Sequence, residues 1–82
     1  MNLRRSQFGH LPDEVVDLIV DNQWTVLRAW REHLNLSADV VAQRIDVTPK
    51  VYEMLERTEY LPADMRQLIA KALGISPEQL DV

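Results

Sequence analysis

Two helix start signals, at Ser37 and at Thr48–Pro49, lie close together near the middle of the chain and constrain its fold most strongly. Ser and Thr side chains accept hydrogen bonds from the free amides at a helix start, and Pro fits the first helical position. We therefore predict helices over residues 37–44 and 48–57, joined by a short turn. Two short helices joined so closely must bury side chains between them. The side chains expected there are those of Ala42, Val47, Tyr52 and Leu55.

The rest of the chain predicts three more helices. Aspartates recur every four residues in the segment 12–22, among apolar residues, which indicates a helix with one solvated acidic face. A second helix is expected over 25–33, where Asn35 tolerates the left-handed conformation that ends a helix. A third follows over 62–73, and a short turn over 76–80 closes the chain. With no strand pattern and no internal repeat, the sequence predicts an all-α fold of five helices.

The length of 82 residues fits one small domain. Residues 1–10 show no apolar periodicity, and Arg4 and Arg5 are their strongest feature, so we interpret them as a flexible basic arm. The single domain is then expected over residues 11–82. A domain of this size buries a limited fraction of its surface, which makes a homodimer or another protein partner a plausible source of further stability.

Composition excludes several classes of function. The chain has no cysteine and two histidines, so we expect no disulfide, no metal site and no cofactor. No apolar run approaches the roughly 20 residues that span a bilayer, and the two arginines are not followed by a signal-peptide core, which predicts a cytoplasmic protein with no membrane contact. No nucleophile, base and orienting acid can be assembled from the spacing, so we expect no enzyme. The net charge of −4 restricts any DNA-binding surface to a local patch.

The stretch from Leu27 to Leu80 resembles the λ-repressor and Cro-like helix-turn-helix regulators. The resemblance is carried by Arg31, Ser37, Ala42, Val47 and Glu56, and by the closing run Pro62, Ile69, Ala70, Leu73, Gly74 and Ile75. It implies a five-helix λ-repressor-like domain in which the helix over 12–22 is an extra N-terminal helix. It also implies that residues 37–57 form the helix-turn-helix unit, with 48–57 as the reading helix.

In that family, residues at the positions of Arg31 and Glu56 commonly form a salt bridge between the first helix and the reading helix, and the resemblance implies the same pair here. A guanidinium and a carboxylate partly buried between helices would hold a fixed hydrogen-bonded geometry. The alternative is that Arg31 and Glu56 are two independent, solvated surface charges.

The resemblance also places the first turn and outer face of the reading helix in a major groove. The candidate DNA-contacting residues are Ser37, Ala38, Thr48, Pro49, Lys50, Glu53, Met54 and Arg57. Lys50 and Arg57 can approach phosphates or guanine, and the free amides at Ser37 and Thr48 can bind phosphate. Arg4 and Arg5 are candidates for an arm that reaches a minor groove or phosphates.

Several residues depart from the family pattern. Ala38 stands where members often carry Gln, and Pro49 where they carry Arg, Gln or Ser, so neither side chain can donate bidentate hydrogen bonds to a base. Asp46 and Thr58 stand where the family often has Gly. Glu53 adds negative charge to a face expected to meet phosphates, although it could also accept from cytosine. Direct readout of bases is therefore expected to be sparse.

A second resemblance concerns the runs 11–16 and 27–34, which are similar to small antitoxin-like regulators encoded beside RelE-type or ParE-type toxins. It implies an autorepressing antitoxin that binds a double-stranded operator as a homodimer and has a cognate toxin as its partner. The competing hypothesis is a protein-interaction module, such as a toxin neutraliser or adaptor, in which DNA binding is weak or lost.

Overall fold

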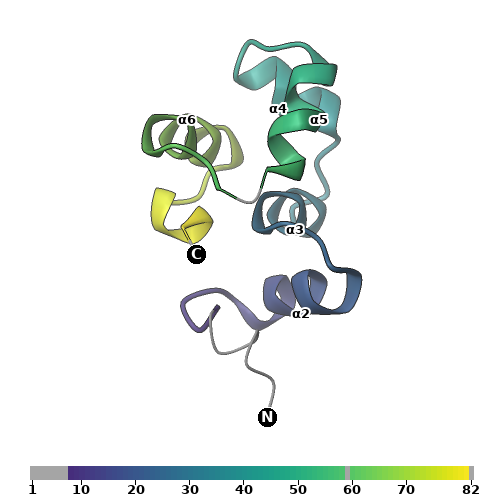
Figure 1. The fold of residues 1–82 in the computed structure, drawn as a ribbon, viewed down its shortest axis with the longest axis vertical. Helices are drawn as coiled ribbons and strands as arrows, with labels where there is room; N and C mark the ends of the chain where they lie inside the picture. The colour runs from purple at the N-terminus through teal and green to yellow at the C-terminus, as the bar shows by residue number, and fades with distance from the viewer. Residues whose placement is uncertain (1–7, 59, 82) are drawn as a thin grey trace.

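The computed structural model describes residues 8–58 and 60–81, and this part of the chain is helical without β-strands (Figure 1). The elements are α2 (Asp13–Asn22), α3 (Val26–His33), α4 (Ala38–Arg44), α5 (Pro49–Arg57), α6 (Ala63–Leu73) and the 3-10 helix η1 (Pro77–Leu80). Each lies within the range predicted from the sequence. The all-α prediction is confirmed.

Side-chain caps explain why three of these helices begin where they do. The Oγ1 atom of Thr25 accepts a hydrogen bond from the amide of Arg28 at 3.3 Å, and so caps α3. Ser37 Oγ accepts from Val40 at the start of α4, and Thr48 Oγ1 accepts from Val51 at the start of α5. These caps satisfy amides that have no partner inside the helix.

Residues in the left-handed conformation separate the helices. Asn35 has φ +59° after α3, as predicted, and Gly74 has φ +78° after α6. Asp46 also has φ +59°, and it forms the turn between α4 and α5. Glycine adopts a positive φ without steric cost, whereas Asp46 pays a small one.

We therefore expect Asp46→Gly to stabilise the protein by about 0.5 kcal/mol and Asp46→Ala to destabilise it by about 1 kcal/mol. Both variants remove the carboxylate, so the difference between them isolates the backbone effect from the charge. Urea unfolding followed by circular dichroism measures both free energies. Equal stability of the two variants would contradict the explanation.

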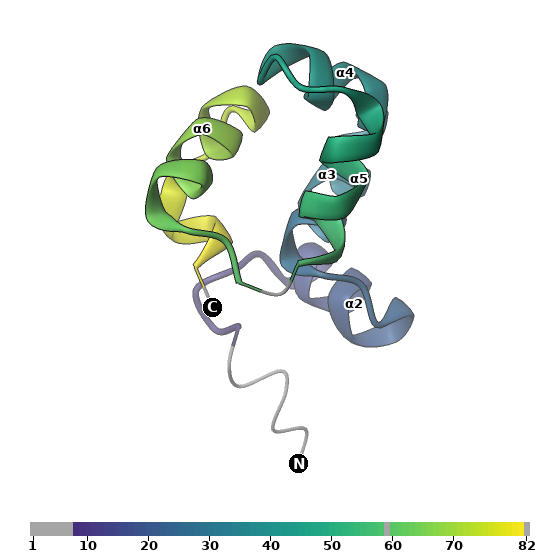
Figure 2. The ribbon, with the colours of Figure 1, turned by 45° about the horizontal axis from the view of Figure 1, so that its top comes forward.

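The helices pack around one apolar core. α2 packs on α3, α3 contacts α5, α4 packs on both α5 and α6, and η1 packs on α6. In Figures 1 and 2 the α4–α5 pair lies at one end of the molecule, α3 lies between this pair and α2, and α6 with η1 lies alongside. The largest fully buried side chains come from four of these helices. They are Tyr52, Ile19, Ile69, Val15 and Val41.

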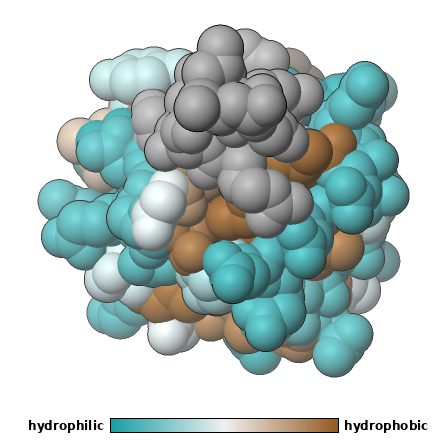
Figure 3. Space-filling view, turned by 90° about the horizontal axis from the view of Figure 1, so that it is seen from below, coloured by the Kyte–Doolittle hydropathy of each residue, from teal (hydrophilic) through white to brown (hydrophobic). Residues whose placement is uncertain are grey.

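The face of α2 that carries its aspartates is exposed, as the acidic periodicity predicted. Asp13, Asp17 and Asp21 are all exposed, while Val15, Val16 and Ile19 of the same helix are buried. The space-filling view of this end of the molecule shows hydrophilic side chains with apolar surface between them (Figure 3). Within residues 8–58 and 60–81, none of the helices combines the length and the hydropathy of a membrane span.

The predicted boundary between a flexible arm and the domain at residue 10 needs correction. Phe8 is buried, with 6% of its surface exposed, and its carbonyl accepts a hydrogen bond from the amide of Leu11. The His10 ring is hydrogen-bonded to the Asp81 carbonyl at 2.8 Å. Residues 8–10 therefore pack on the domain, because one aromatic ring supplies a contact that periodicity cannot reveal. Arg4 and Arg5 lie outside the described residues.

Candidate nucleic-acid interface

The helix α5 has a buried side and an exposed side. Tyr52 is fully buried, and Glu56, one turn further on, faces α3. The opposite side carries Lys50, Val51, Met54 and Arg57, which are all exposed and which we call the outer face of α5. Three of them, Lys50, Met54 and Arg57, are spaced by four and three residues and so share one helix face. Glu53, three residues after Lys50 and four before Arg57, is exposed on the same side of the helix.

Seven of the eight candidate DNA-contacting residues have exposed side chains, and Ala38 is half-buried. Val51 was not among these candidates, although 44% of its surface is exposed. Its position three residues before Met54 is the signal that could have found it. The structure thus brings Lys50, Met54 and Arg57 together on one face, with Thr48 and Pro49 at its start and Ser37 at the start of α4.

The ion pair implied by the resemblance is present between α3 and α5. Arg31 Nε lies 2.6 Å from Glu56 Oε2, and Arg31 Nη2 donates to Glu56 Oε1 at 2.9 Å. Only 11% of the Arg31 side chain and 12% of the Glu56 side chain are exposed, so these are not independent surface charges. Arg31 Nη1 also donates to the Leu36 carbonyl at 2.9 Å. One guanidinium therefore fixes α5 and the segment before α4 relative to α3.

The electrostatics of this pair favour its charged form. Burial alone would raise the pKa of Glu56, but the hydrogen bond from Arg31 and its positive charge outweigh burial and lower the pKa. The hydrogen bond to Glu56 raises the pKa of Arg31. The Tyr52 hydroxyl is buried beside the pair, and it finds no well-aligned hydrogen-bond partner within the described chain. Burial, followed by the Glu56 carboxylate, raises the pKa of Tyr52 far above its usual value.

Thr25 and Thr58 make hydrogen bonds to the last turn of α5 that the sequence did not suggest, although the cap at Thr25 was predicted. Thr25 caps α3, and its hydroxyl also donates to the Glu56 carbonyl at 2.5 Å, which ties the end of α5 to the start of α3. Thr58 donates from its hydroxyl to the Met54 carbonyl, and its φ is −79°. Because any residue adopts that φ, the departure from glycine at Thr58 introduces no backbone strain, unlike the departure at Asp46.

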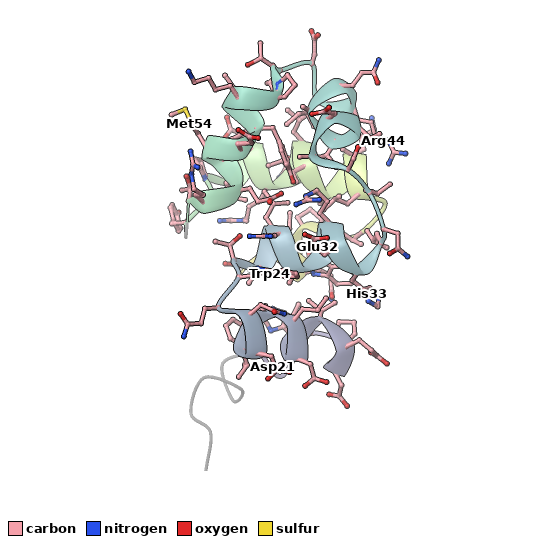
Figure 4. The ribbon with its side chains drawn as sticks, turned by 90° about the vertical axis from the view of Figure 1, so that its right-hand side faces the viewer. Asp21, Trp24, Glu32, His33, Arg44 and Met54 are labelled. Carbon is pink, nitrogen blue, oxygen red and sulfur yellow. The ribbon has the colours of Figure 1, made fainter. Side chains whose placement is uncertain are left out.

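The positive charge of the outer face is local. Lys50 and Arg57 are exposed on it, whereas Arg44 donates from Nη1 to the Ala72 carbonyl on α6 at 2.8 Å. Figure 4 shows Met54 and Arg44 on opposite sides of the α4–α5 pair. Among the residues that the structure describes, no group of His, Cys, Asp or Glu is placed to hold a metal ion. The arrangement suits contact with an extended polyanion, because two cations flank a small exposed surface on a rigidly held helix.

The two short helices α4 and α5 are joined by a tight turn. The second contacts α3 on its inner side and is exposed on its outer face. This arrangement defines a helix-turn-helix domain. The sequence matches a helix-turn-helix family over residues 27–80, which is more than half of the chain. The chain belongs to this family, of the λ-repressor and Cro-like type, and the match supports a DNA-binding regulator. No match was found among curated proteins or among solved structures. α2 lies outside the matched residues, and its interpretation as an addition to the family's helices stays a prediction.

Proposed function

We propose that the protein is a transcription regulator that binds a palindromic operator as a homodimer, with α5 of each copy in a major groove. The observation that carries the proposal is the outer face of α5, where Lys50 and Arg57 are exposed on a helix fixed from behind by the Arg31–Glu56 pair. In a dimer of this kind, the two reading helices enter the groove about 34 Å apart.

Binding of the full chain to DNA from its own promoter, compared with random duplex DNA, tests this proposal. We expect tighter binding to the promoter, and weaker binding to both duplexes as salt rises, because contacts between cations and phosphates release counterions. Fluorescence anisotropy across a salt series measures both properties. Absence of binding to the promoter at low salt would overturn the proposal.

Lys50→Ala is expected to weaken DNA binding about fivefold to tenfold. If Lys50 contacts phosphate, binding to all sequences weakens and the slope against salt falls by about 1. If it contacts a base, preference relaxes at one base pair instead. Lys71→Ala is the matched control, because Lys71 is an exposed lysine on α6 beside Arg44, away from the outer face. Equal loss in both variants would contradict an interface on α5.

We further propose that the protein is an autorepressing antitoxin with a cognate toxin as partner. The support is the similarity of residues 11–16 and 27–34 to antitoxin-like regulators. A toxin gene beside the chain's own gene, and a stable complex of the two purified proteins, are the expected findings. A neighbouring gene without toxin activity would remove the antitoxin role while leaving DNA binding untouched.

A second candidate function is a protein-interaction module that has lost useful DNA binding and catalyses no reaction. The net charge of −4 favours it, as do Glu53 beside Lys50 and Arg57 and the exposed apolar side chains of Val51 and Met54. The promoter-binding experiment separates the two candidates. A chain that forms a complex with the neighbouring gene product but binds no DNA would establish the second.

A further inference from the structure

The outer face of α5 carries two exposed apolar side chains beside its charges. Four large apolar side chains are strongly exposed in the described chain: Val51 (44%), Met54 (58%), Tyr60 (71%) and Leu68 (43%). Single exposed apolar residues are ordinary on a protein surface. Val51 and Met54 differ from the others because they lie one turn apart on the same short helix, and because Met54 lies between Lys50 and Arg57 in the helical spacing.

We propose that Met54 and Val51 read thymine, by packing against the C5-methyl groups that thymine presents in the major groove. This inference rests on the proposed function, and it names the base that the interface selects. Thymine is the base that shows an apolar group in that groove, whereas the others show hydrogen-bond donors and acceptors. A thioether and a branched alkyl side chain match a methyl group and cannot satisfy a base edge that requires a strong hydrogen bond.

The neighbouring residues on α5 support base contact by the apolar side chains. Pro49, at the start of α5, has no side-chain donor and makes no hydrogen bond to a base, which leaves Lys50 as the charged donor of the first turn. Arg57 lies in the last turn, and reading helices contact bases mainly through their N-terminal part. Arg57 is therefore placed to contact phosphate, Lys50 in the first turn can reach either a phosphate or a base, and Val51 and Met54 supply the apolar contact with the bases.

A second copy of this chain is the other candidate partner for the exposed Val51 and Met54 side chains. In a symmetric contact through this face, Met54 would meet its own counterpart, and Lys50 and Arg57 would be brought close to the same cations of the other copy. Like charges brought together in this way repel each other, whereas DNA supplies the opposite charge. Glu53, exposed on the same side of the helix, could pair with one of these cations, but two positive and one negative side chain leave the face with a net charge of +1. Two copies of this face therefore still repel each other, and the charges favour DNA over a second copy.

The test uses the full chain and a duplex selected from a random library. Each thymine of the selected site is replaced in turn by deoxyuridine, which lacks only the methyl group. We expect about a fourfold loss of affinity at one or two positions, which is the value of one buried methyl group. Met54→Ala should bind the thymine and uracil duplexes equally at one of these positions. Leu68→Ala, which removes an exposed apolar side chain from α6, should keep the full preference.

Each other outcome overturns the inference. Equal affinity for thymine and uracil at every position, with specific binding retained, removes methyl readout but leaves the proposed function standing. Absence of binding to any duplex removes both. Sedimentation of Met54→Ala is expected to give the same molar mass as the unmodified protein, and a change from dimer to monomer would instead identify the outer face as a contact between copies.

Discussion

Glu56→Ala is expected to lower the free energy of unfolding by about 3 kcal/mol, because it leaves the Arg31 guanidinium buried without its counter-charge. Two hydrogen bonds to Glu56, of 2.6 and 2.9 Å, would be lost, and Arg31 would keep only its bond to the Leu36 carbonyl and a longer contact with Glu32. A domain of this size has about 5 kcal/mol of stability in total, so the variant should be close to unfolding at 37 °C.

Two further variants distinguish the free-energy cost of leaving Arg31 without its counter-charge from the cost of losing a single side-chain contact. Glu32→Ala removes an acid that is 35% exposed and lies 3.6 Å from Arg31, and this variant should cost no more than about 0.5 kcal/mol. The double variant Arg31→Met, Glu56→Leu removes both charges and should recover much of the loss, since apolar side chains of similar size often replace buried ion pairs. Urea unfolding measures all three. Equal costs for Glu56→Ala and Glu32→Ala would show that the pair does not stabilise the fold.

The pH dependence of the same comparison has a defined sign. The pKa of Glu56 in the folded state lies below its ordinary value of 4.5. The folded state therefore stabilises the charged carboxylate relative to the unfolded chain. The resulting stability is present above that ordinary pKa and is lost as pH falls through the lowered folded-state pKa. The difference in stability between the unmodified protein and Glu56→Ala should therefore be constant near neutral pH and shrink in acid. A difference that grows in acid would contradict this linkage.

Helix boundaries were predictable from the sequence because their signals are local. Ser37, Thr48 and Gly74 act through the geometry of residues within one turn, so their identity alone indicates where a helix starts or ends. The exposed side of α5 followed in the same way from helical spacing. The partnership of Arg31 with Glu56 was available only through resemblance, because 25 residues separate them and no periodicity links them.

Contacts that depend on the arrangement of whole helices were not predictable. The bond of the His10 ring to the Asp81 carbonyl, the bond from Thr25 to the Glu56 carbonyl, and the bond from Trp30 Nε1 to the Gln79 carbonyl at 3.0 Å all join segments far apart in the chain. Each of these contacts is made by a residue type that has a local role at other positions, so the residue type alone does not indicate the contact. Their partners are decided by tertiary packing, which a single sequence does not encode in any short pattern.

Tyr52→Ala is expected to lower the free energy of unfolding by about 4 kcal/mol. Tyr52 is the largest of the fully buried side chains, and it lies on the inner side of α5, one turn before Glu56. Its removal leaves a cavity behind the reading helix, and the surrounding helices can close that cavity only in part. Loss of this packing should also weaken DNA binding at temperatures where the variant is still folded, because α5 would no longer hold one position.

Tyr52→Phe tests which part of the side chain positions α5. The ring volume is kept and only the hydroxyl is lost, and that hydroxyl has no well-aligned partner in the described chain. Removal of a buried polar group that is not hydrogen-bonded costs little, so we expect stability within about 0.5 kcal/mol of the unmodified protein and unchanged DNA affinity. A loss above about 1 kcal/mol would show that the hydroxyl bonds to Glu56 in solution and belongs to the ion-pair network. With the expected result, the aromatic ring holds α5 by packing, and the Arg31–Glu56 pair holds it by charge.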